Sequence, residues 1–340
     1  METKKILIYG ATGYTGKLFA KHLLANGIKP ILAARSNKVK EIGTKLNCDT
    51  RVFSIENASS NLADIDFLVN LAGPFAITQD ALIEACIKTK THYLDIAGEY
   101  EEVKNASKHH DDASEAGIVV LSAAGFGVVP TDIAAKIACE NIENPTDLKI
   151  IYATVGGASR GTLKTVLKDI QKEGHILQNH SYEKAMPAQS AVKAKVFDKS
   201  FTAVYNPWRA DLFSAHQSTG VGNIETYSEF PSFVVSMMHG KLNWLRNLIM
   251  NRLINLLPEG PSDKQLQKGN TFIKAVATNS KGEESVTEMR GPEAYLFTVI
   301  CIQKMLELIS NNQSIKGSIT PSDLGTDWVL AMDGIEVKFV

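Results

Sequence analysis

Three glycines near the N-terminus have the spacing of a phosphate-binding turn. Gly10, Gly13 and Gly16 lie in GATGYTG, between an apolar run at residues 4–9 and a segment at 17–25 whose apolar residues recur at helical spacing. In such a strand–turn–helix unit one glycine permits the turn, one lets the backbone approach a pyrophosphate, and one lets helix and sheet pack closely. The N-terminus of the helix favours the anion. The pattern therefore predicts a dinucleotide site.

Competing interpretations of this turn differ in the ligand they require. A P-loop needs G-x-x-x-x-G-K-[ST], but Gly10 and Gly16 are one residue too far apart for it and Leu18 follows Lys17. A glycine turn without a ligand stays an alternative. Thr12 occupies the middle-glycine position of G-x-G-x-x-G, so the turn is a G-x-x-G-x-x-G variant. The residues expected to contact the cofactor here are Gly10, Thr12, Gly13, Tyr14, Thr15 and Gly16.

The end of the second predicted strand distinguishes between two dinucleotides. An NAD site usually presents an Asp or Glu about 20 residues past the glycines, whereas the strand at residues 30–34 is followed by Arg35 and Ser36. No carboxylate occurs from residue 3 to residue 40. A guanidinium beside a hydroxyl suits the 2′-phosphate of NADP(H). We therefore expect NADP(H) as the cofactor, the alternative being that Arg35 is only a solvated strand end.

The surrounding elements predict a Rossmann-type fold and a second domain. Further strands are expected at residues 66–70, 92–96 and 118–122 and a helix at 80–88, which is the alternation of a doubly wound parallel sheet. A Gly- and Pro-rich loop precedes Pro130, where we place the domain boundary. Strands at 149–155, 200–205, 270–278 and 284–290, with helices at 163–172 and 293–309, indicate a mixed α+β domain.

Composition limits the class of protein. The chain has 340 residues, 44% hydrophobic and 21% charged, with a formal net charge of -1, which suits two soluble domains and does not favour nucleic acid as a partner. The four cysteines are scattered and predict neither disulfides nor a metal site. The N-terminus runs directly into a strand without the pattern of a secretory signal. We expect a cytoplasmic protein.

Residues 230–258 have a composition of their own. They contain no acidic residue and carry leucines at helical spacing flanked by Arg246 and Arg252, which predicts an amphipathic cationic helix. Such a helix either packs on its domain or on a second copy in a homodimer, or it contacts a membrane surface or covers an apolar substrate. It is too interrupted by polar residues to span a bilayer.

Several separated motifs resemble the saccharopine dehydrogenase-like oxidoreductase family, which includes trans-acting enoyl reductases. They occur in family order along the whole chain and are YGATGYTGKLFAKHL, NLAGPF, HYLDIAGE, AGFGVVPTDIAA, GGASRGT, RGPEAY and ITPSDLG. The resemblance implies an NADP-binding domain at residues 1–130, a substrate and oligomerisation domain at 131–290, and a segment at about 291–340 that returns to the first domain.

The resemblance also gives NLAGPF a role. Ala72 and Gly73 would leave room for the ribose and pyrophosphate of the cofactor, and Pro74 would fix the bend. From the residues alone, the same segment is only a turn between strand and helix. The family reduces either C=C bonds of lipid-like enoyl groups or the imines of charged amino acids, and the resemblance does not choose between them.

The catalytic candidates are weaker than the cofactor site. Asp132 follows a strand-end loop and is expected either to orient substrate or relay a proton, or to cap a helix that starts at Thr131 or Asp132 and runs through residue 140. Arg209 is expected to clamp an anionic substrate or enolate oxygen, or to form an ordinary ion pair.

Two other groups of residues have alternative interpretations. Tyr100 and Lys104 form the Y-x-x-x-K of short-chain dehydrogenases, which we interpret as a coincidence because the other motifs belong to a different family. Asp95 and Glu99 lie at a strand end, where they either touch ribose or satisfy backbone donors.

The sequence therefore favours an NADPH-dependent reductase of a small to medium-sized substrate and leaves open whether that substrate is apolar. Two other functions stay open, a non-enzymatic NADP(H)-binding redox sensor and a lipid-surface adaptor that uses residues 230–258.

Overall fold

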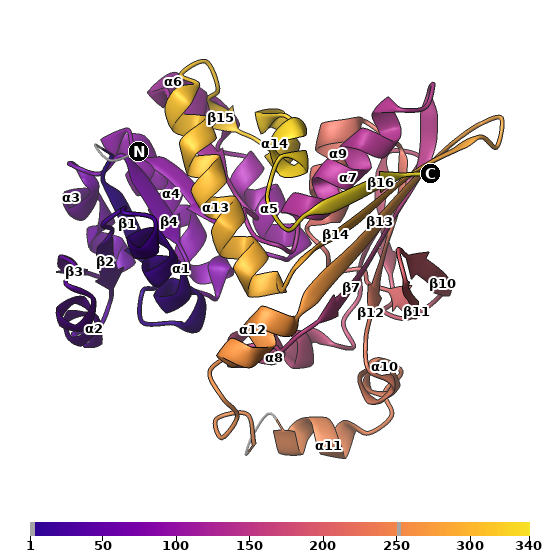
Figure 1. Ribbon diagram of the computed structural model, residues 1–340, viewed down its shortest axis with the longest axis horizontal. Coiled ribbons are helices and arrows are strands. Elements are labelled where there is room, and N and C mark those ends of the chain that lie inside the picture. Colours follow the sequence, from indigo (N-terminus) through magenta and orange to yellow (C-terminus); the bar gives the residue numbers. More distant parts are fainter. Residues whose placement is uncertain (1–3, 250–252) are drawn as a thin grey trace. The chain divides into compact units, whose positions relative to one another are not determined.

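The computed structural model describes residues 4–249 and 253–340 and divides into two compact units. The first unit comprises Met1–Val129 and Phe297–Leu324, and the second comprises Pro130–Leu296 and Gly325–Val340. Each unit contains one sheet. The chain therefore leaves the first unit after Val129, returns to it in the long helix α13 (Figure 1), and leaves it again after Leu324.

The sheet of the first unit is wholly parallel. Its strands are β1 (Ile6–Tyr9), β2 (Ile31–Ala34), β3 (Thr50–Val52), β4 (Phe67–Asn70), β5 (His92–Asp95), β6 (Val119–Leu121) and β15 (Gly317–Ser318). They follow the order β15-β6-β5-β4-β1-β2-β3. The strand order changes direction between β1 and β4, and ligands of such sheets bind at this switch point, at the carboxyl ends of the strands.

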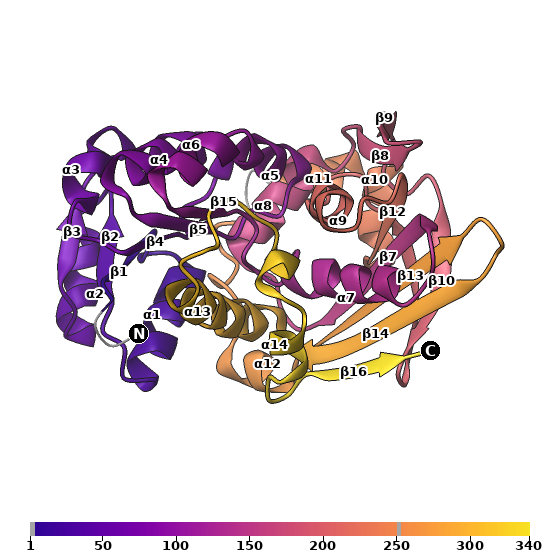
Figure 2. The ribbon, with the colours of Figure 1, turned by 90° about the horizontal axis from the view of Figure 1, so that it is seen from above.

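Helices cover both faces of this sheet, as expected for a doubly wound fold. They are α1 (Tyr14–Ala25), α2 (Lys38–Leu46), α3 (Ala58–Leu62), α4 (Phe75–Thr89), α5 (Tyr100–Ser107), α6 (His110–Ala116) and α13 (Ala294–Asn311), with 3₁₀ turns at Ile55–Asn57 and Pro321–Leu324. In Figure 2 helices α4 and α6 lie on one side of the sheet, and α1 and α13 lie on the other. The Rossmann-type fold class predicted from the sequence is confirmed.

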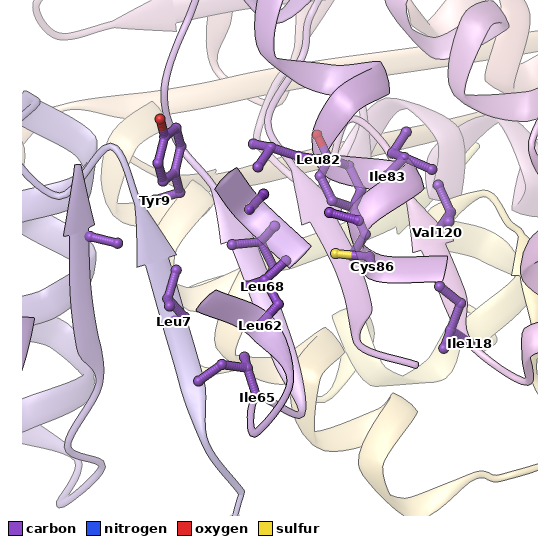
Figure 3. Packing of buried hydrophobic residues seen from close by; sticks show 14 of the residues in the cluster. Leu7, Tyr9, Leu62, Ile65, Leu68, Leu82, Ile83, Cys86, Ile118 and Val120 are labelled. Carbon is purple, nitrogen blue, oxygen red and sulfur yellow. The ribbon is translucent and has the colours of Figure 1, made fainter. Parts of the chain in front are cut away.

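A hydrophobic core lies between the sheet and α4 (Figure 3). Leu7 and Leu68 from the strands and Leu82 and Cys86 from α4 are fully buried in it. Each leucine buried in this way stabilises the fold by roughly 1.5–3 kcal/mol relative to an exposed one. The short parallel strands are thus held by apolar packing on both faces, which fixes the positions of the loops at their ends.

The second unit is an α+β domain, as predicted, and its sheet contains both parallel and antiparallel pairs. Its strands are β7 (Pro145–Val155), β8 (Gly174–Gln178), β9 (Ser181–Ala185), β10 (Ala191–Val196), β11 (Lys199–Tyr205), β12 (Asn223–Glu229), β13 (Asn270–Asn279), β14 (Glu284–Pro292) and β16 (Glu336–Phe339). The main order is β10-β11-β12-β7-β13-β14-β16, with β12 and β7 parallel and the other pairs antiparallel. Its helices are α7 (Val129–Glu140), α8 (Arg160–Asp169), α9 (Asp211–Thr219), α10 (Ser232–Met238), α11 (Asn243–Leu248), α12 (Asp263–Lys268) and α14 (Asp327–Leu330).

The structure differs from the sequence-based expectations at three places. Residues 325–340 lie in the second unit, and not with the part of 291–340 that returns to the first, because β16 pairs with β14. Helix α7 begins at Val129, so Asp132 lies inside its first turn and is not its cap. The expected helix in 230–258 is divided: α10 ends before Gly240 and Leu242, both with positive φ, and α11 covers only the first part of the stripe expected at 242–257, of which residues 250–252 lie outside the described residues.

Candidate functional site

The glycine turn after β1 packs directly against the segment after β4. Gly10 has a φ of +88°, and a Cβ at this position would lie 2.6 Å from the carbonyl carbon of Leu71. The amide of Leu71 donates to the carbonyl of Tyr9, and the amide of Gly10 donates to the carbonyl of Ala33. Only glycine fits this close approach and this backbone conformation. The turn is thereby fixed between the ends of β2 and β4.

The other two glycines have different physical roles. A Cβ on Gly16 would lie 2.4 Å from the carbonyl oxygen of Gly10, so Gly16 lets α1 begin directly above the turn. A Cβ on Gly13 would come within 4 Å of the Gly10 carbonyl oxygen alone, at 3.4 Å. Gly13 has an extended conformation and is the N-cap of α1. The surrounding protein would therefore tolerate a side chain at residue 13. A glycine at such a position fits a site where a bound phosphate group, and not the protein, needs the space at the helix N-terminus.

The end of β2 brings a cation to the same turn. The amides of Gly10 and Ala11 both donate to the carbonyl of Ala33, at 2.9 and 3.1 Å. Arg35 and Ser36 follow within three residues, and both are exposed. Burial raises the pKa of Tyr9, and the charge of Arg35 opposes that increase. The guanidinium thus lies near the carboxyl edge of the sheet, at a place suited to a ribose phosphate.

The turn after β4 is held by a buried asparagine. Asn70 accepts a hydrogen bond from the amide of Ala72 at 3.1 Å, and the hydroxyl of Thr78 donates to the carbonyl of Ala72 at 2.9 Å. The Gly73–Pro74 peptide bond is cis, and both residues are exposed. A Cβ on Gly73 would meet nothing within 4 Å. The backbone of this turn is therefore fixed on its inner side and open on its outer side.

The predicted cofactor residues meet at one edge of the first sheet. Strands β2, β1 and β4 are adjacent and parallel, and the register places Tyr9 beside both Ala33 and Asn70. The segments 10–16, 35–36 and 72–74 follow the carboxyl ends of these strands. The narrow turn, the open position at Gly13 and the cation after β2 fit the pyrophosphate and 2′-phosphate of a nicotinamide dinucleotide.

Asp132 is buried in the second unit. Its carboxylate accepts hydrogen bonds from the hydroxyls of Ser214 at 3.1 Å and Ser218 at 2.8 Å, both on α9. The exposed fraction of Asp132 is 0%. This geometry favours a role in packing α7 against α9, and the predicted catalytic role stays a prediction.

Arg209 lies in the same unit and also contacts α9. Its guanidinium donates to both carboxylate oxygens of Asp211, the first residue of α9, and lies 4.0 Å from the ring centroid of Tyr152. Arg209 and Asp211 are both buried. Although burial alone would lower it, the neighbouring Asp211 raises the pKa of Arg209. The arginine is thus part of a buried ion pair, and its predicted contact with substrate stays a prediction.

The Y-x-x-x-K pair does not have the geometry of a catalytic acid. Tyr100 is only 2% exposed, and the ammonium of Lys104 lies over its ring at 5.3 Å from the centroid. Burial raises the pKa of Tyr100 to about 12, whereas a catalytic pair uses the ammonium to lower it. On the same helix, burial and then the charge of Glu99 raise the pKa of Glu102 to about 7.

Sequence reasoning missed most of a buried polar network behind the site. Asp95 is fully buried and accepts hydrogen bonds from the side chains of Tyr93, Gln79 and Ser122. Of the two roles expected for Asp95, the structure shows the satisfaction of backbone donors, because the amides of Ala97 and Ala123 also donate to it. The signal in the sequence was a polar residue at or directly after the end of three apolar strands, namely Asn70, Asp95 and Ser122.

Within residues 4–249 and 253–340, no group of three or more His, Cys, Asp or Glu side chains is placed to hold a metal ion. None of the helices in these described ranges has both the length and the hydropathy that crossing a bilayer requires.

Known proteins resemble the chain in sequence and in fold. An aligned stretch of 140 residues is 31% identical to a trans-acting enoyl reductase of Mycobacterium tuberculosis and covers 38% of this chain and 34% of that protein. A lipid droplet localized protein of Caenorhabditis elegans is 25% identical over 160 residues, which cover 42% of this chain and 37% of that protein. The chain thus matches less than half the length of these relatives.

The likeness to a solved structure extends over the whole chain. Apo saccharopine dehydrogenase (L-Glu forming) from Saccharomyces cerevisiae superimposes with a TM-score of 0.64 at 11% identity, covering 99% of this chain and 100% of that one. At this identity the likeness shows a shared fold. Residues 6–121, which contain the glycine turn, Arg35 and the turn after β4, match the saccharopine dehydrogenase NADP binding domain. Residues 6–121 of the first unit therefore form a domain of the saccharopine dehydrogenase NADP-binding type, and the whole chain shares the fold of saccharopine dehydrogenase.

Proposed function

We propose that this protein is an NADPH-dependent oxidoreductase that reduces a polarised C=C or C=N bond of a small, lipid-like molecule. The observation that carries the proposal is the meeting of the glycine turn, Arg35 and the turn after β4 at the switch point of the first sheet. When bound, the reduced nicotinamide supplies a hydride to the electron-poor atom of the double bond, and a proton completes the reduction.

The residues of the first unit have separate tasks in this proposal. The amides around Gly13 bind the pyrophosphate, and Arg35 with Ser36 binds the 2′-phosphate by charge-assisted hydrogen bonds. The turn of Ala72, Gly73 and Pro74 supports the ribose on the nicotinamide side. Thr12, Tyr14 and Thr15 complete the wall of the turn.

The substrate class rests on two independent supports. One relative is named as an enoyl reductase, and enoyl groups are polarised C=C bonds. The second unit also presents large apolar side chains in residues 230–258, of which Trp244 is 67% and Leu256 80% exposed. Both favour an apolar substrate over a charged amino acid.

A cofactor-consumption assay tests the proposal. The purified protein is mixed with NADPH and a panel of α,β-unsaturated thioesters and cyclic imines, and the loss of reduced-nicotinamide absorbance is followed. We expect turnover with at least one enoyl compound. Tight NADPH binding without turnover of any panel member would support a redox sensor, and the absence of binding would remove both functions.

A second candidate function is contact with a lipid surface through residues 230–258. In this segment Leu245 and Ile249 pack inward against the cluster formed by Val234, Met237 and Met238, whereas Phe233, Trp244 and Leu256 are exposed. Met250, Asn251 and Arg252 lie outside the described residues. Because the segment has no carboxylate and carries Lys241, an anionic bilayer would not repel it.

Vesicle binding tests this second candidate. The fluorescence emission of Trp244 should shift to shorter wavelength when anionic vesicles are added. The double variant Trp244→Ser, Leu256→Ser should no longer sediment with these vesicles. Ile77→Ser removes an equally exposed apolar side chain from the first unit and serves as the matched control. Equal vesicle binding by the double variant and the Ile77→Ser control would show that residues 230–258 do not form the lipid contact.

We further propose a homodimer in the cytoplasm. The family resemblance supports the dimer, and the four unpaired, buried cysteines suit a reducing compartment. Sedimentation equilibrium tests the first point, and imaging of a fluorescent fusion tests the second. A single species at the 37.1 kDa mass of one chain would contradict the dimer.

A further inference from the structure

A chain of hydrogen bonds connects a buried carboxylate to the backbone beside the cofactor site. The amide of Ala72 donates to Asn70 at 3.1 Å, the side-chain amide of Asn70 donates to the hydroxyl of Tyr93 at 3.0 Å, and that hydroxyl donates to Asp95 at 2.9 Å. Asn70 and Tyr93 are buried. Every donor in this chain points toward Asp95.

The direction of the chain is fixed at both of its ends. A backbone amide can only donate, so the oxygen of Asn70 must face Ala72 and its nitrogen must face Tyr93. A carboxylate can only accept, so Tyr93 must donate to Asp95. Burial and the neighbouring Asp95 raise the pKa of Tyr93 well above its usual value, which keeps the hydroxyl protonated.

The same carboxylate also holds two other loops at this edge of the sheet. Its second oxygen accepts from the amide of Ala97 and the amide of Ala123, each at 3.0 Å, and from the hydroxyl of Ser122 at 2.9 Å. Ala123 has a φ of +63°, in the left-handed region that costs a non-glycine residue about 1 kcal/mol or more. Asp95 thus stabilises a strained residue at the start of the loop after β6.

We propose that Asp95 is a positioning residue that fixes, through Tyr93 and Asn70, the turn at residues 72–74 for cofactor binding. This inference rests on the proposed NADPH site and adds to it a residue that does not touch the cofactor, because Asp95 is 0% exposed. The loops after β4, β5 and β6 are then one hydrogen-bonded unit at the cofactor edge.

Replacing the carboxylate by an amide would break the direction of the chain. In Asp95→Asn only one side-chain oxygen remains. It must face the backbone amides of Ala97 and Ala123, because these groups can only donate. The new NH₂ group therefore faces Tyr93. The hydroxyl of Tyr93 then meets two donors and loses its own acceptor. If Asn70 flips to relieve this, its nitrogen faces the amide of Ala72. Either outcome loosens the turn at residue 72.

The test compares three variants by NADPH affinity and by hydrogen exchange at the amide of Ala72. Asp95→Asn should weaken NADPH binding about tenfold or more, since charge-assisted bonds are affected. Tyr93→Phe removes only the connecting hydroxyl and should weaken binding about fivefold, as expected for one ordinary buried hydrogen bond. Both variants should accelerate exchange at Ala72.

Asp66→Asn is the matched control. The carboxylate of Asp66 accepts hydrogen bonds from the backbone amide of Lys5 at 2.8 Å and from the ammonium of Lys4 at 2.9 Å. Asp66 lies just before the amino end of β4 and therefore at the opposite edge of the same sheet. It should leave NADPH affinity within about twofold of wild type and exchange at Ala72 unchanged, even if stability falls.

Wild-type affinity and wild-type exchange at Ala72 in both Asp95→Asn and Tyr93→Phe would overturn the inference, as would an equal loss of affinity in Asp66→Asn. The exchange measurement needs no ligand. Failure of the wild-type protein to bind NADPH would therefore count against the proposed function and is distinguishable from failure of this inference.

Discussion

Two alanine substitutions in the glycine turn should separate binding from stability. Gly13→Ala should abolish most NADPH affinity while leaving the fold as stable as wild type. Gly10→Ala should instead destabilise the first unit, because its methyl group would overlap the backbone of Leu71 at 2.6 Å. The two residues lie three positions apart in one turn, so each variant is the control for the other.

The magnitudes follow from the local backbone. At Gly10 the φ of +88° costs an alanine about 1–2 kcal/mol, and with the steric overlap the loss in unfolding free energy is about 3 kcal/mol. At Gly13 the poorer N-cap costs about 0.5–1 kcal/mol. Alanine also reduces the conformational freedom of the unfolded chain, which stabilises the folded protein by about 0.4–1 kcal/mol. The net change in unfolding free energy is therefore near zero. The new methyl group, however, occupies the approach of the pyrophosphate to the helix amides.

Urea unfolding and calorimetric NADPH titration measure the two effects. For Gly13→Ala we expect an unchanged unfolding midpoint and at least about a tenfold loss of affinity, the equivalent of one charge-assisted hydrogen bond. Wild-type affinity in a folded Gly13→Ala protein would refute the assignment of this turn to the pyrophosphate. A fully stable Gly10→Ala protein would refute the close approach to Leu71.

The remaining predictions concern titration and ion pairing. Because burial raises the pKa of Glu102 to about 7 from 4.5, folding favours its protonated form, and the resulting stability is present below about pH 4.5 and lost as the pH rises through 7. Because Glu102 is partly exposed, Glu102→Gln should raise the unfolding free energy at pH 8 by only about 1 kcal/mol and change it little at pH 4. Glu101→Gln is the exposed control, and the same pH dependence of the unfolding free energy in both variants would contradict the prediction. Arg209→Met should cost about 3 kcal/mol in urea unfolding because Asp211 stays buried without its partner, and adding Asp211→Leu should restore at least half of that loss. A fully stable Arg209→Met protein that has lost turnover would instead support contact with substrate.

The first unit was predictable because its signals are local. The apolar runs before Gly10 and before Leu71 are short, fully buried strands, and their order along the chain with intervening helices specifies a parallel sheet. The three-residue strand β3 and the short helix α5 were not predicted, because such short elements are stabilised mainly by packing and leave little periodic pattern in the sequence.

The candidate site was predictable where it depends on single residue types. The spacing of the glycines and the charge of Arg35 indicate a phosphate-binding site. The network of Asp95 was not predictable, because it joins residues from 70 to 122 that meet only when β4, β5 and β6 pair in register. The composition of 230–258 misled in a different way: its leucines begin only at Leu242, and the positive φ at Gly240 and Leu242 separates them from α10.

The most direct test of the central claim is a calorimetric titration of the purified protein with NADPH and with NADH, repeated on Arg35→Ala. We expect NADPH to bind at least about tenfold tighter than NADH, and Arg35→Ala to remove this preference. No heat of binding with either dinucleotide, or an unchanged preference in Arg35→Ala, would contradict it.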